Sequence, residues 1–186
     1  MKKTSRSSYI EHRNITEDSS VQRTMLVPDH IIDRMIRSFY PYWKRQKEAI
    51  AYWFGKEINS ENTDVVLTLV IPKAIHTPGH YEVSMDETTR MGNKMLESGM
   101  ICLAQVHTHP EGVAFHSKYD DLHSLSQRNG FLSLVVQNYG KVPIFNLEGI
   151  NVHEFFEGSW RILGKEQKLW RIKIINDFVD LRIDDT

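Results

Sequence analysis

The chain has 186 residues, of which 40% are hydrophobic and 25% charged, and its formal net charge is −1 at neutral pH. These values fit one sizeable hydrophobic core and give no general electrostatic reason to bind nucleic acid. A single cysteine excludes an internal disulfide and any multi-cysteine zinc site. No apolar run approaches membrane-spanning length, so we expect a cytoplasmic protein without a signal peptide or a membrane partner.

The first 22 residues are polar and serine-rich, and we expect them to form a flexible tail before a single domain over residues 23–186. The first predicted helix begins near Pro28, which suits a first helical turn, and ends at Pro41, which cannot continue a helix. One face of this helix is apolar and carries Ile31, Ile32, Met35, Ile36 and Phe39.

Two further helices are predicted where a serine is followed three residues later by an acidic residue, which is the pattern of a capped helix start. Ser84 begins a helix that ends at Gly99, and Ser117 begins a helix that runs to about Arg128. The inward side chains of the first of these helices are predicted to be Met91, Met95 and Leu96.

Strands are predicted in the other apolar runs, and residues 73–83 are expected to form a loop. The predicted strands are 49–55, 64–72, 100–106, a run from 131, 142–147, 150–156, 160–163 and a last strand near 170–174. Because strands outnumber helices and the helices are interspersed, the class is α/β or α+β with a largely antiparallel sheet.

Two histidines separated by one residue lie in the stretch QVHTHP at residues 105–110. Each residue taken singly fits an ordinary strand end and helix cap, but that interpretation leaves the pair unexplained. Because side chains alternate along a strand, His107 and His109 point the same way and can chelate one ion, whereas Cys102 should face away and only pack. Asp120, at the next helix start, can supply a third ligand. Two histidines, an aspartate and an open fourth position form a catalytic zinc site.

Two segments together resemble the JAMM signature of JAB/MPN-domain zinc metalloproteases. The first runs from His107 to Pro110, and the second, after six residues, from Ser117 to Asp120. The resemblance covers about residues 25–163. Within the family, the chain is similar to stand-alone prokaryotic deubiquitinase-like members. It implies a JAB/MPN-like fold, with a mixed sheet flanked by helices in a cytidine-deaminase-like layering. It also implies that the two histidines and the aspartate hold one Zn²⁺ ion per chain.

The same resemblance implies two catalytic residues. The family has an upstream glutamate that acts as general base, and Glu48, which begins the stretch EAIAYWFG, matches its placement. The nearby Glu57, Glu61 and Glu82 have no matching motif. Ser117 matches the residue that donates a hydrogen bond to the oxyanion, and it can also be the helix cap.

Active members of this family typically cut after the C-terminal glycine of ubiquitin or a ubiquitin-like protein. The resemblance therefore implies an isopeptidase or peptidase in a prokaryotic ubiquitin-like conjugation or antiphage defence system. Its partners would be the tail of the ubiquitin-like protein, the conjugates, and the activating and conjugating enzymes. His76, His80 and His116 lie where they can touch this substrate, although such histidines are more often on the surface.

Three alternatives stay open on sequence alone. A RadC-like, DNA-associated protein shares the motif but usually has Ser-Gly after the proline, where this chain has Glu111 and Gly112. A peptidase that processes a sulfur-carrier protein and a non-catalytic MPN scaffold are the others, although scaffolds commonly lose the metal ligands that are present here. The stretch HEFFE at residues 153–157 superficially resembles a zincin motif, but we expect it to be the surface of a hairpin.

Overall fold

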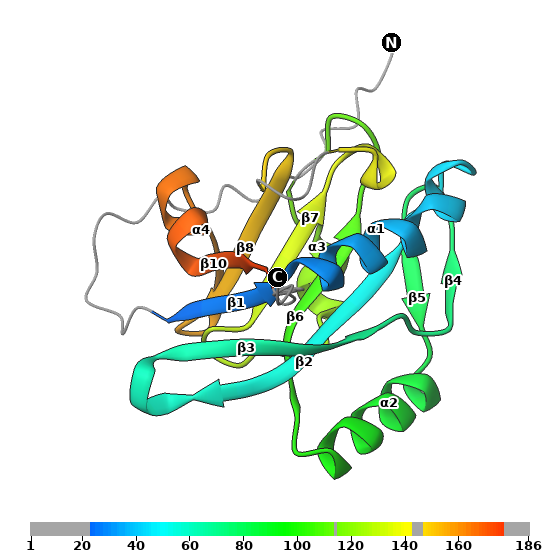
Figure 1. Cartoon of the computed structure of the whole chain (residues 1–186). Helices are drawn as coiled ribbons and strands as arrows, with labels where there is room; N and C mark the ends of the chain where they lie inside the picture. Colours follow the sequence, from blue (N-terminus) through cyan, green and yellow to red (C-terminus); the bar gives the residue numbers. More distant parts are fainter. Residues whose placement is uncertain (1–22, 114, 143–146, 177–186) are drawn as a thin grey trace, which may run out of the picture.

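The computed structural model shown in Figure 1 describes residues 23–113, 115–142 and 147–176. The tail predicted over residues 1–22 lies outside the described residues, and so does the centre of the strand predicted at 142–147. None of the described helices is long and apolar enough to cross a membrane.

The described residues form ten strands, four α-helices and two short 3₁₀-helices, Asn59–Glu61 and Asn138–Gly140. The strands are β1 (Thr24–Pro28), β2 (Ile50–Ile58), β3 (Thr63–Val70), β4 (Ala74–His76), β5 (Tyr81–Val83), β6 (Ile101–Thr108), β7 (Leu132–Val136), β8 (Ile150–Phe156), β9 (Ser159–Ile162) and β10 (Ile172–Ile175). The helices are α1 (Asp29–Trp43), α2 (Met85–Glu97), α3 (Lys118–His123) and α4 (Lys165–Arg171).

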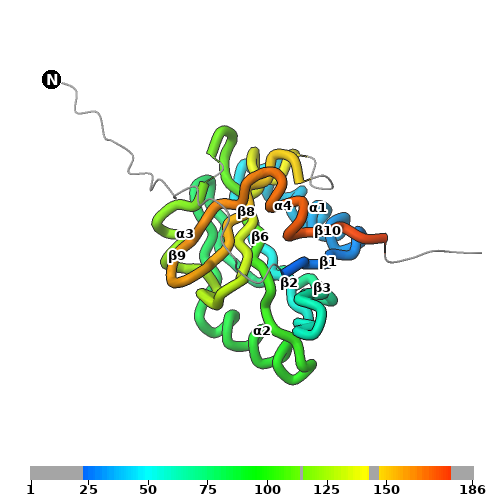
Figure 2. Tube along the Cα trace, turned by 90° about the vertical axis from the view of Figure 1, so that its left-hand side faces the viewer, coloured from blue at the N-terminus to red at the C-terminus, as the bar shows by residue number. Residues whose placement is uncertain are grey.

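Eight of the strands form one mixed sheet in the order β10-β1-β3-β2-β6-β7-β8-β9, and β4 and β5 form a separate hairpin. Four neighbouring pairs of the large sheet are antiparallel and three are parallel. Figure 2 shows α1 on one side of β2 and β6, and α3 on the other side. The predicted α/β class, with a curled mixed sheet flanked by helices, is confirmed.

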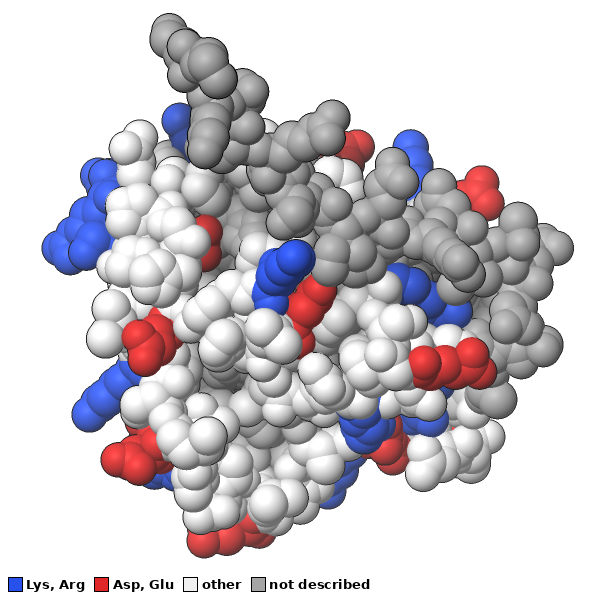
Figure 3. Space-filling view, turned by 180° about the vertical axis from the view of Figure 1, so that it is seen from behind, with Lys and Arg blue, Asp and Glu red and all other residues white. Residues whose placement is uncertain are grey.

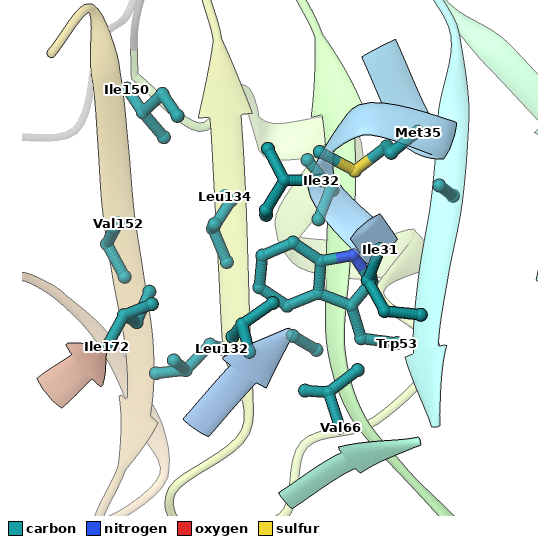
Figure 4. Packing of buried hydrophobic residues seen from close by; sticks show 14 of the residues in the cluster. Ile31, Ile32, Met35, Trp53, Val66, Leu132, Leu134, Ile150, Val152 and Ile172 are labelled. Atoms are coloured by element: carbon teal, nitrogen blue, oxygen red, sulfur yellow. The ribbon is translucent and has the colours of Figure 1, made fainter. Parts of the chain in front are cut away.

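The larger hydrophobic core lies between α1 and the sheet. Buried side chains at Ile31, Ile32, Met35 and Phe39 repeat with the helical period and pack against strand residues from β2, β3, β6, β7 and β8. The indole of Trp53 is fully buried at the centre of this cluster (Figure 4). The part of this face that α1 covers is therefore mainly apolar, as the sequence predicts for residues on the inward side of the helix.

The opposite face of the sheet has a smaller apolar cluster and the polar side chains of the motif. Met91 and Met95 of α2 pack there against Ile50, Tyr52 and Phe54 of β2. The predicted third inward residue of α2 is exposed, so the prediction for Leu96 is wrong. It follows Met95 directly on the helix, and a rotation of 100° per residue carries it to the solvent side.

A buried ion cluster shows how strongly the sheet curls. Arg171, at the end of α4, donates hydrogen bonds to Asp64 on β3 (3.2 Å) and to Glu154 on β8 (3.1 Å). In the order of the sheet, β3 and β8 are separated by β2, β6 and β7. A single side chain can join these strands only because the sheet curves around the core.

Several predicted boundaries near the first helix are wrong. Met25 lies in the short strand β1 between β3 and β10, which was not predicted, and Pro28 is the helix N-cap rather than part of the first turn. The helix continues past Pro41 to Trp43. Pro41 has no amide hydrogen to donate to the carbonyl of Arg37. It lies on the exposed side of the helix, where water can bind that carbonyl instead.

Two segments near the site also differ from their predictions. The predicted loop contains the β4–β5 hairpin, in which Ala74 pairs with Val83. The helix that begins after Ser117 ends at His123 instead of near Arg128. It ends early because Gln105, from β6, accepts the hydrogen of the Leu125 amide, which would otherwise belong to the next helical turn.

A bulge in β6 overturns the prediction that Cys102 faces away from the histidines. The register between β2 and β6 shifts by one residue next to Phe54, which lies opposite Cys102, so Leu103 is an extra residue. Farther along, Ile50 lies opposite His107. Ile50 and Phe54 belong to the same apolar cluster, so Cys102 and His107 lie on the same face of the sheet. The bulge inverts the alternation of side chains. Cys102 packs in the smaller apolar cluster, and burial raises the pKa of its thiol.

Candidate metal centre

Two strand residues and one helix residue meet at the end of β6. His107 and His109 lie on the same face, as predicted, because the amide of His109 continues the ladder with a bond to Val136 O (2.9 Å). Nε2 of His107 is 3.4 Å from Asp120 Oδ1, and Nε2 of His109 is 3.3 Å from Asp120 Oδ2. One ligand atom from each of the three buried residues lies within 4.8 Å of the others.

The imidazole nitrogens of this cluster fit a metal ion. Both ring nitrogens of His107 and Nδ1 of His109 are buried and have no hydrogen-bond partner among the described residues. Buried polar atoms are rarely left unpaired, because each one costs about 1–3 kcal/mol. Two imidazoles and a carboxylate are a donor set that suits a divalent transition metal such as zinc. A metal ion bound through Nε2 of His107 would give that nitrogen a partner and remove part of this cost.

Ser117 holds the third ligand in place. The backbone N–H and the hydroxyl of Ser117 each donate to Asp120 Oδ2 at 2.7 Å, and the Asp120 amide donates back to Ser117 Oγ at 3.2 Å. The predicted capping box is therefore present. Burial disfavours ionisation of Asp120, but His107 and His109 outweigh it and hold the pKa of this carboxyl well below its usual range.

Glu48 lies next to the three ligands. Ala49 and Thr108 are linked by two hydrogen bonds of 2.8 and 3.0 Å, and continuing this register places Glu48 opposite His109. Glu48 is only 3% exposed, although it is charged. Burial, with a contribution from the charge of Asp120, raises the pKa of Glu48 to about 8. In the metal-free protein, burial therefore favours the neutral form of this carboxyl.

The other nearby glutamates have different surroundings. Glu57 forms an ion pair with Arg128 on the surface, and Glu61 and Glu82 are exposed. None of these three is buried beside the ligands. Glu48 is therefore the glutamate whose environment suits the role that the family motif gives it, and that role stays a prediction.

The β4–β5 hairpin holds the main chain of Glu48. The Glu48 amide donates to Thr77 O, and His76 Nδ1 donates to Glu48 O, both at 2.8 Å. The ring of His76 also contacts the ring of Tyr42, with centroids 3.9 Å apart. His80 is exposed, and its ring lies 6.0 Å from that of Tyr119 on α3. Substrate contact by His76 and His80 stays a prediction, but His76 also positions the proposed base.

Two histidines that were expected on the surface are buried. His116 is 4% exposed, and His153, in the HEFFE stretch, is fully buried. The predicted hairpin is present, formed by β8 and β9, but the expectation that residues 153–157 are on the surface is wrong for residues 153–155, because β8 is an inner strand between β7 and β9. Any role of His116 in substrate binding stays a prediction.

Tyr81 is a neighbour of the site that the sequence did not reveal. It lies on β5, is buried, and its ring centroid is 5.4 Å from that of His107. Burial raises the pKa of its phenol well above the usual value, with contributions from Tyr52, Asp120 and Glu48. The predicted loop over this region carried no motif that would have pointed to it.

Together, the curled sheet and the site define an α/β protein with a buried His-His-Asp metal centre at the end of a central strand. Residues 34–146, more than half of the chain, match the family described as prokaryotic homologs of the JAB domain. The protein belongs to this family, as the motif predicts. The matched segment contains all three candidate ligands as well as Glu48 and Ser117.

Among the known proteins that are similar to this chain are a probable metalloprotease and a protein of known structure. It is 29% identical over 125 residues to the "Probable metalloprotease y4jG" of Sinorhizobium fredii (strain NBRC 101917 / NGR234), which covers 65% of this chain and 75% of that protein. The solution structure of protein DSY2949 from Desulfitobacterium hafniense superposes with a TM-score of 0.60 and 13% identity. That superposition covers 83% of this chain and 94% of DSY2949. The second likeness supports the fold alone.

Proposed function

We propose that this protein is a zinc-dependent metallopeptidase of the JAMM type. The observation that carries the proposal is the convergence of Nε2 of His107 and Nε2 of His109 on the buried carboxylate of Asp120, with the buried carboxyl of Glu48 beside them. Family membership and the similarity to a probable metalloprotease support it. Zinc suits three such protein ligands because its fourth position stays open for catalysis.

The side chains of the site have separate tasks in hydrolysis. His107, His109 and Asp120 would hold the zinc ion, which would supply Lewis acidity at the scissile carbonyl. Glu48 accepts a proton from the attacking water and returns it to the leaving amine, as a carboxyl group beside the site can. The hydroxyl of Ser117 turns from Asp120 Oδ2 toward the carbonyl oxygen and stabilises its negative charge.

The proposed substrate is a ubiquitin-like protein, cut after its C-terminal glycine as a conjugate or as a precursor. The JAMM motif supports this choice, because active proteins with the motif typically cut there. A prokaryotic conjugation system, such as an antiphage defence system with its own activating and conjugating enzymes, would supply the substrate. On the face seen in Figure 3, Lys and Arg alternate with Asp and Glu among the described residues, which favours a protein substrate over DNA.

The proposal is tested with purified protein and a set of fusions. A ubiquitin-like domain ending in glycine, fused to a short peptide or linked to a lysine, should be cut after that glycine, and mass spectrometry locates the cut. Elemental analysis should find one zinc per chain, and a chelator should stop cleavage. Cleavage of unrelated amides alone would favour the sulfur-carrier peptidase, and tight, salt-resistant DNA binding would favour the RadC-like protein.

A further inference from the structure

The helix that carries Asp120 has little apolar attachment to the rest of the protein. α3 has six residues, and Asp120 is the only buried one among them, whereas Leu122 is 77% exposed. A helix this short is not stable by itself in water. Other contacts must therefore hold it at the distance from His107 and His109 that a metal ion requires.

A chain of polar side chains attaches the start of α3 to the sheet. His116, directly before the helix cap, bonds through Nδ1 to Asp121 Oδ1 (2.9 Å) and through Nε2 to Ser133 Oγ on β7 (2.7 Å). Gln105 on β6 donates its side-chain amide to the same Ser133 oxygen at 3.0 Å. Residues from a helix, a loop and two strands are thus joined in one sequence of hydrogen bonds.

The partners determine where the hydrogens of this chain lie. The carboxylate of Asp121 can only accept, so Nδ1 of the His116 ring carries a proton and donates it. In the neutral imidazole Nε2 is then the acceptor, and it takes the hydrogen of Ser133 Oγ, which itself accepts one from Gln105. Each of these bonds has one donor and one acceptor, and connected hydrogen bonds of this kind make the surrounding structure more rigid.

Gln105 also holds the far end of α3. Its side-chain oxygen accepts the hydrogen of the Leu125 amide at 3.1 Å, two residues beyond the end of the helix. Gln105 precedes His107 by two residues on the same face of β6. The histidine ligand and both ends of the helix are therefore positioned by one short segment of strand.

The ring of His116 packs against two other ring side chains. It is stacked on His153, with centroids 4.0 Å apart and an interplanar angle of 23°, and its centroid is 4.8 Å from that of Trp160 in an edge contact. His153 lies opposite Ser133 across β7 and β8. The ring of His107 is 5.8 Å away. His116 is thus buried next to the metal centre without being one of its ligands.

We propose that His116 is a positioning residue that, through Asp121 and Ser133, sets the place of α3 and thereby the distance from Asp120 to the two histidine ligands. This inference rests on the proposed function, because it assigns a role at the proposed metal site. Residues outside the ligand shell that orient ligands typically change metal affinity about 10- to 100-fold when they are replaced. We expect an effect of this size here.

The test compares four variants by titration with Zn²⁺ alone against a chromophoric chelator, and by hydrogen exchange of the α3 amides in the metal-free protein. His116→Leu removes both hydrogen bonds, whereas His116→Gln keeps a group that can reach Ser133. Ser133→Ala removes only the hydroxyl. Leu122→Ala, on the exposed side of the same helix, is the matched control.

We expect His116→Leu to weaken zinc binding about 10- to 100-fold and to speed exchange over α3. Ser133→Ala should have a smaller effect of the same kind, His116→Gln should recover part of the affinity, and Leu122→Ala should match the unmodified protein. If His116→Leu does not fold, the comparison between Ser133→Ala and Leu122→Ala decides the matter.

Unchanged zinc affinity and unchanged exchange in both His116→Leu and Ser133→Ala would overturn the positioning role. A loss of global stability without faster exchange confined to α3 would also overturn it. If the unmodified protein binds no zinc, the proposed function fails instead. The exchange rates of the metal-free protein then still show whether His116 holds the helix.

Discussion

The two faces of the central sheet are built from different kinds of side chain. The face under α1 is filled by hydrophobic residues around Trp53, as Figure 4 shows. The other face buries polar groups near the end of β6, including His107, Gln105, Glu48 and Ser133. The apolar face supplies favourable burial, whereas the polar face includes groups whose burial is costly. The comparison indicates that one face maintains the fold and the other serves a function.

The largest expected effect is loss of the metal when a ligand on the polar face is replaced. His107→Ala and Asp120→Ala should each abolish stoichiometric zinc binding and cleavage, because two remaining ligands hold the ion far more weakly. Elemental analysis of the zinc content and a cleavage assay check both statements. A variant with full zinc content would exclude that residue as a ligand.

Glu48→Gln should separate chemistry from metal binding on this face. Glutamine is nearly isosteric but cannot accept the proton, so cleavage should fall about 100- to 10,000-fold, equivalent to roughly 3–5 kcal/mol on the barrier. Zinc content and substrate binding should be kept. Glu61→Gln, which changes an exposed glutamate, should cleave normally. Near-normal turnover by Glu48→Gln would mean that the base is another group, and an equal loss of zinc would make Glu48 a ligand.

A substitution on the apolar face should have the opposite pattern. Ile32→Ala removes part of a fully buried side chain of α1, which should lower the free energy of unfolding by about 2–5 kcal/mol. Its kcat below the melting temperature should be close to that of the unmodified protein, since α1 supplies no ligand. Denaturant unfolding and steady-state kinetics measure the two quantities. A large fall in kcat under conditions where the variant is fully folded would show that the two faces of the sheet are not independent.

Ser117→Ala tests whether one residue on the polar face has two roles. Loss of an oxyanion donor should slow turnover by roughly ten- to a thousandfold while zinc stays bound. Loss of the cap alone should cost about 1 kcal/mol of stability. Turnover is therefore measured well below the melting temperature of each protein. If the lowered melting temperature explains the whole loss of activity, the serine acts only as the cap.

The last expected effect is a pH-dependent gain in stability of the metal-free protein. The pKa of Glu48 is raised from 4.5 to about 8 on folding, so its ionisation opposes folding. This cost is absent below pH 4.5, grows as the pH rises to 8, and is constant above that. Metal-free Glu48→Gln should therefore melt higher than the metal-free unmodified protein at pH 8 and equally at pH 4. Equal melting temperatures of the two metal-free proteins at both pH values would show that ionisation of Glu48 does not destabilise the folded protein.

The sequence by itself determined the elements whose signals are local. The two-residue period of a strand placed His107 and His109 on one side, and the spacing from Ser117 to Asp120 predicted the capping box that the structure contains. The helical period likewise predicted the buried face of α1. These predictions needed only neighbours within a few residues. That is why the candidate ligands and the family could be recognised before any fold was known.

Only the tertiary structure decided the features that depend on distant partners. β1 exists because it pairs with β3 and β10, and Cys102 lies on the histidine face because a bulge against β2 inverts the alternation. His116 is buried because it bonds to Ser133 and stacks on His153, which lie on two strands farther along the chain. Periodicity tells which neighbours share a face, but burial and register depend on which distant strands pair. The sequence shows no local trace of that pairing.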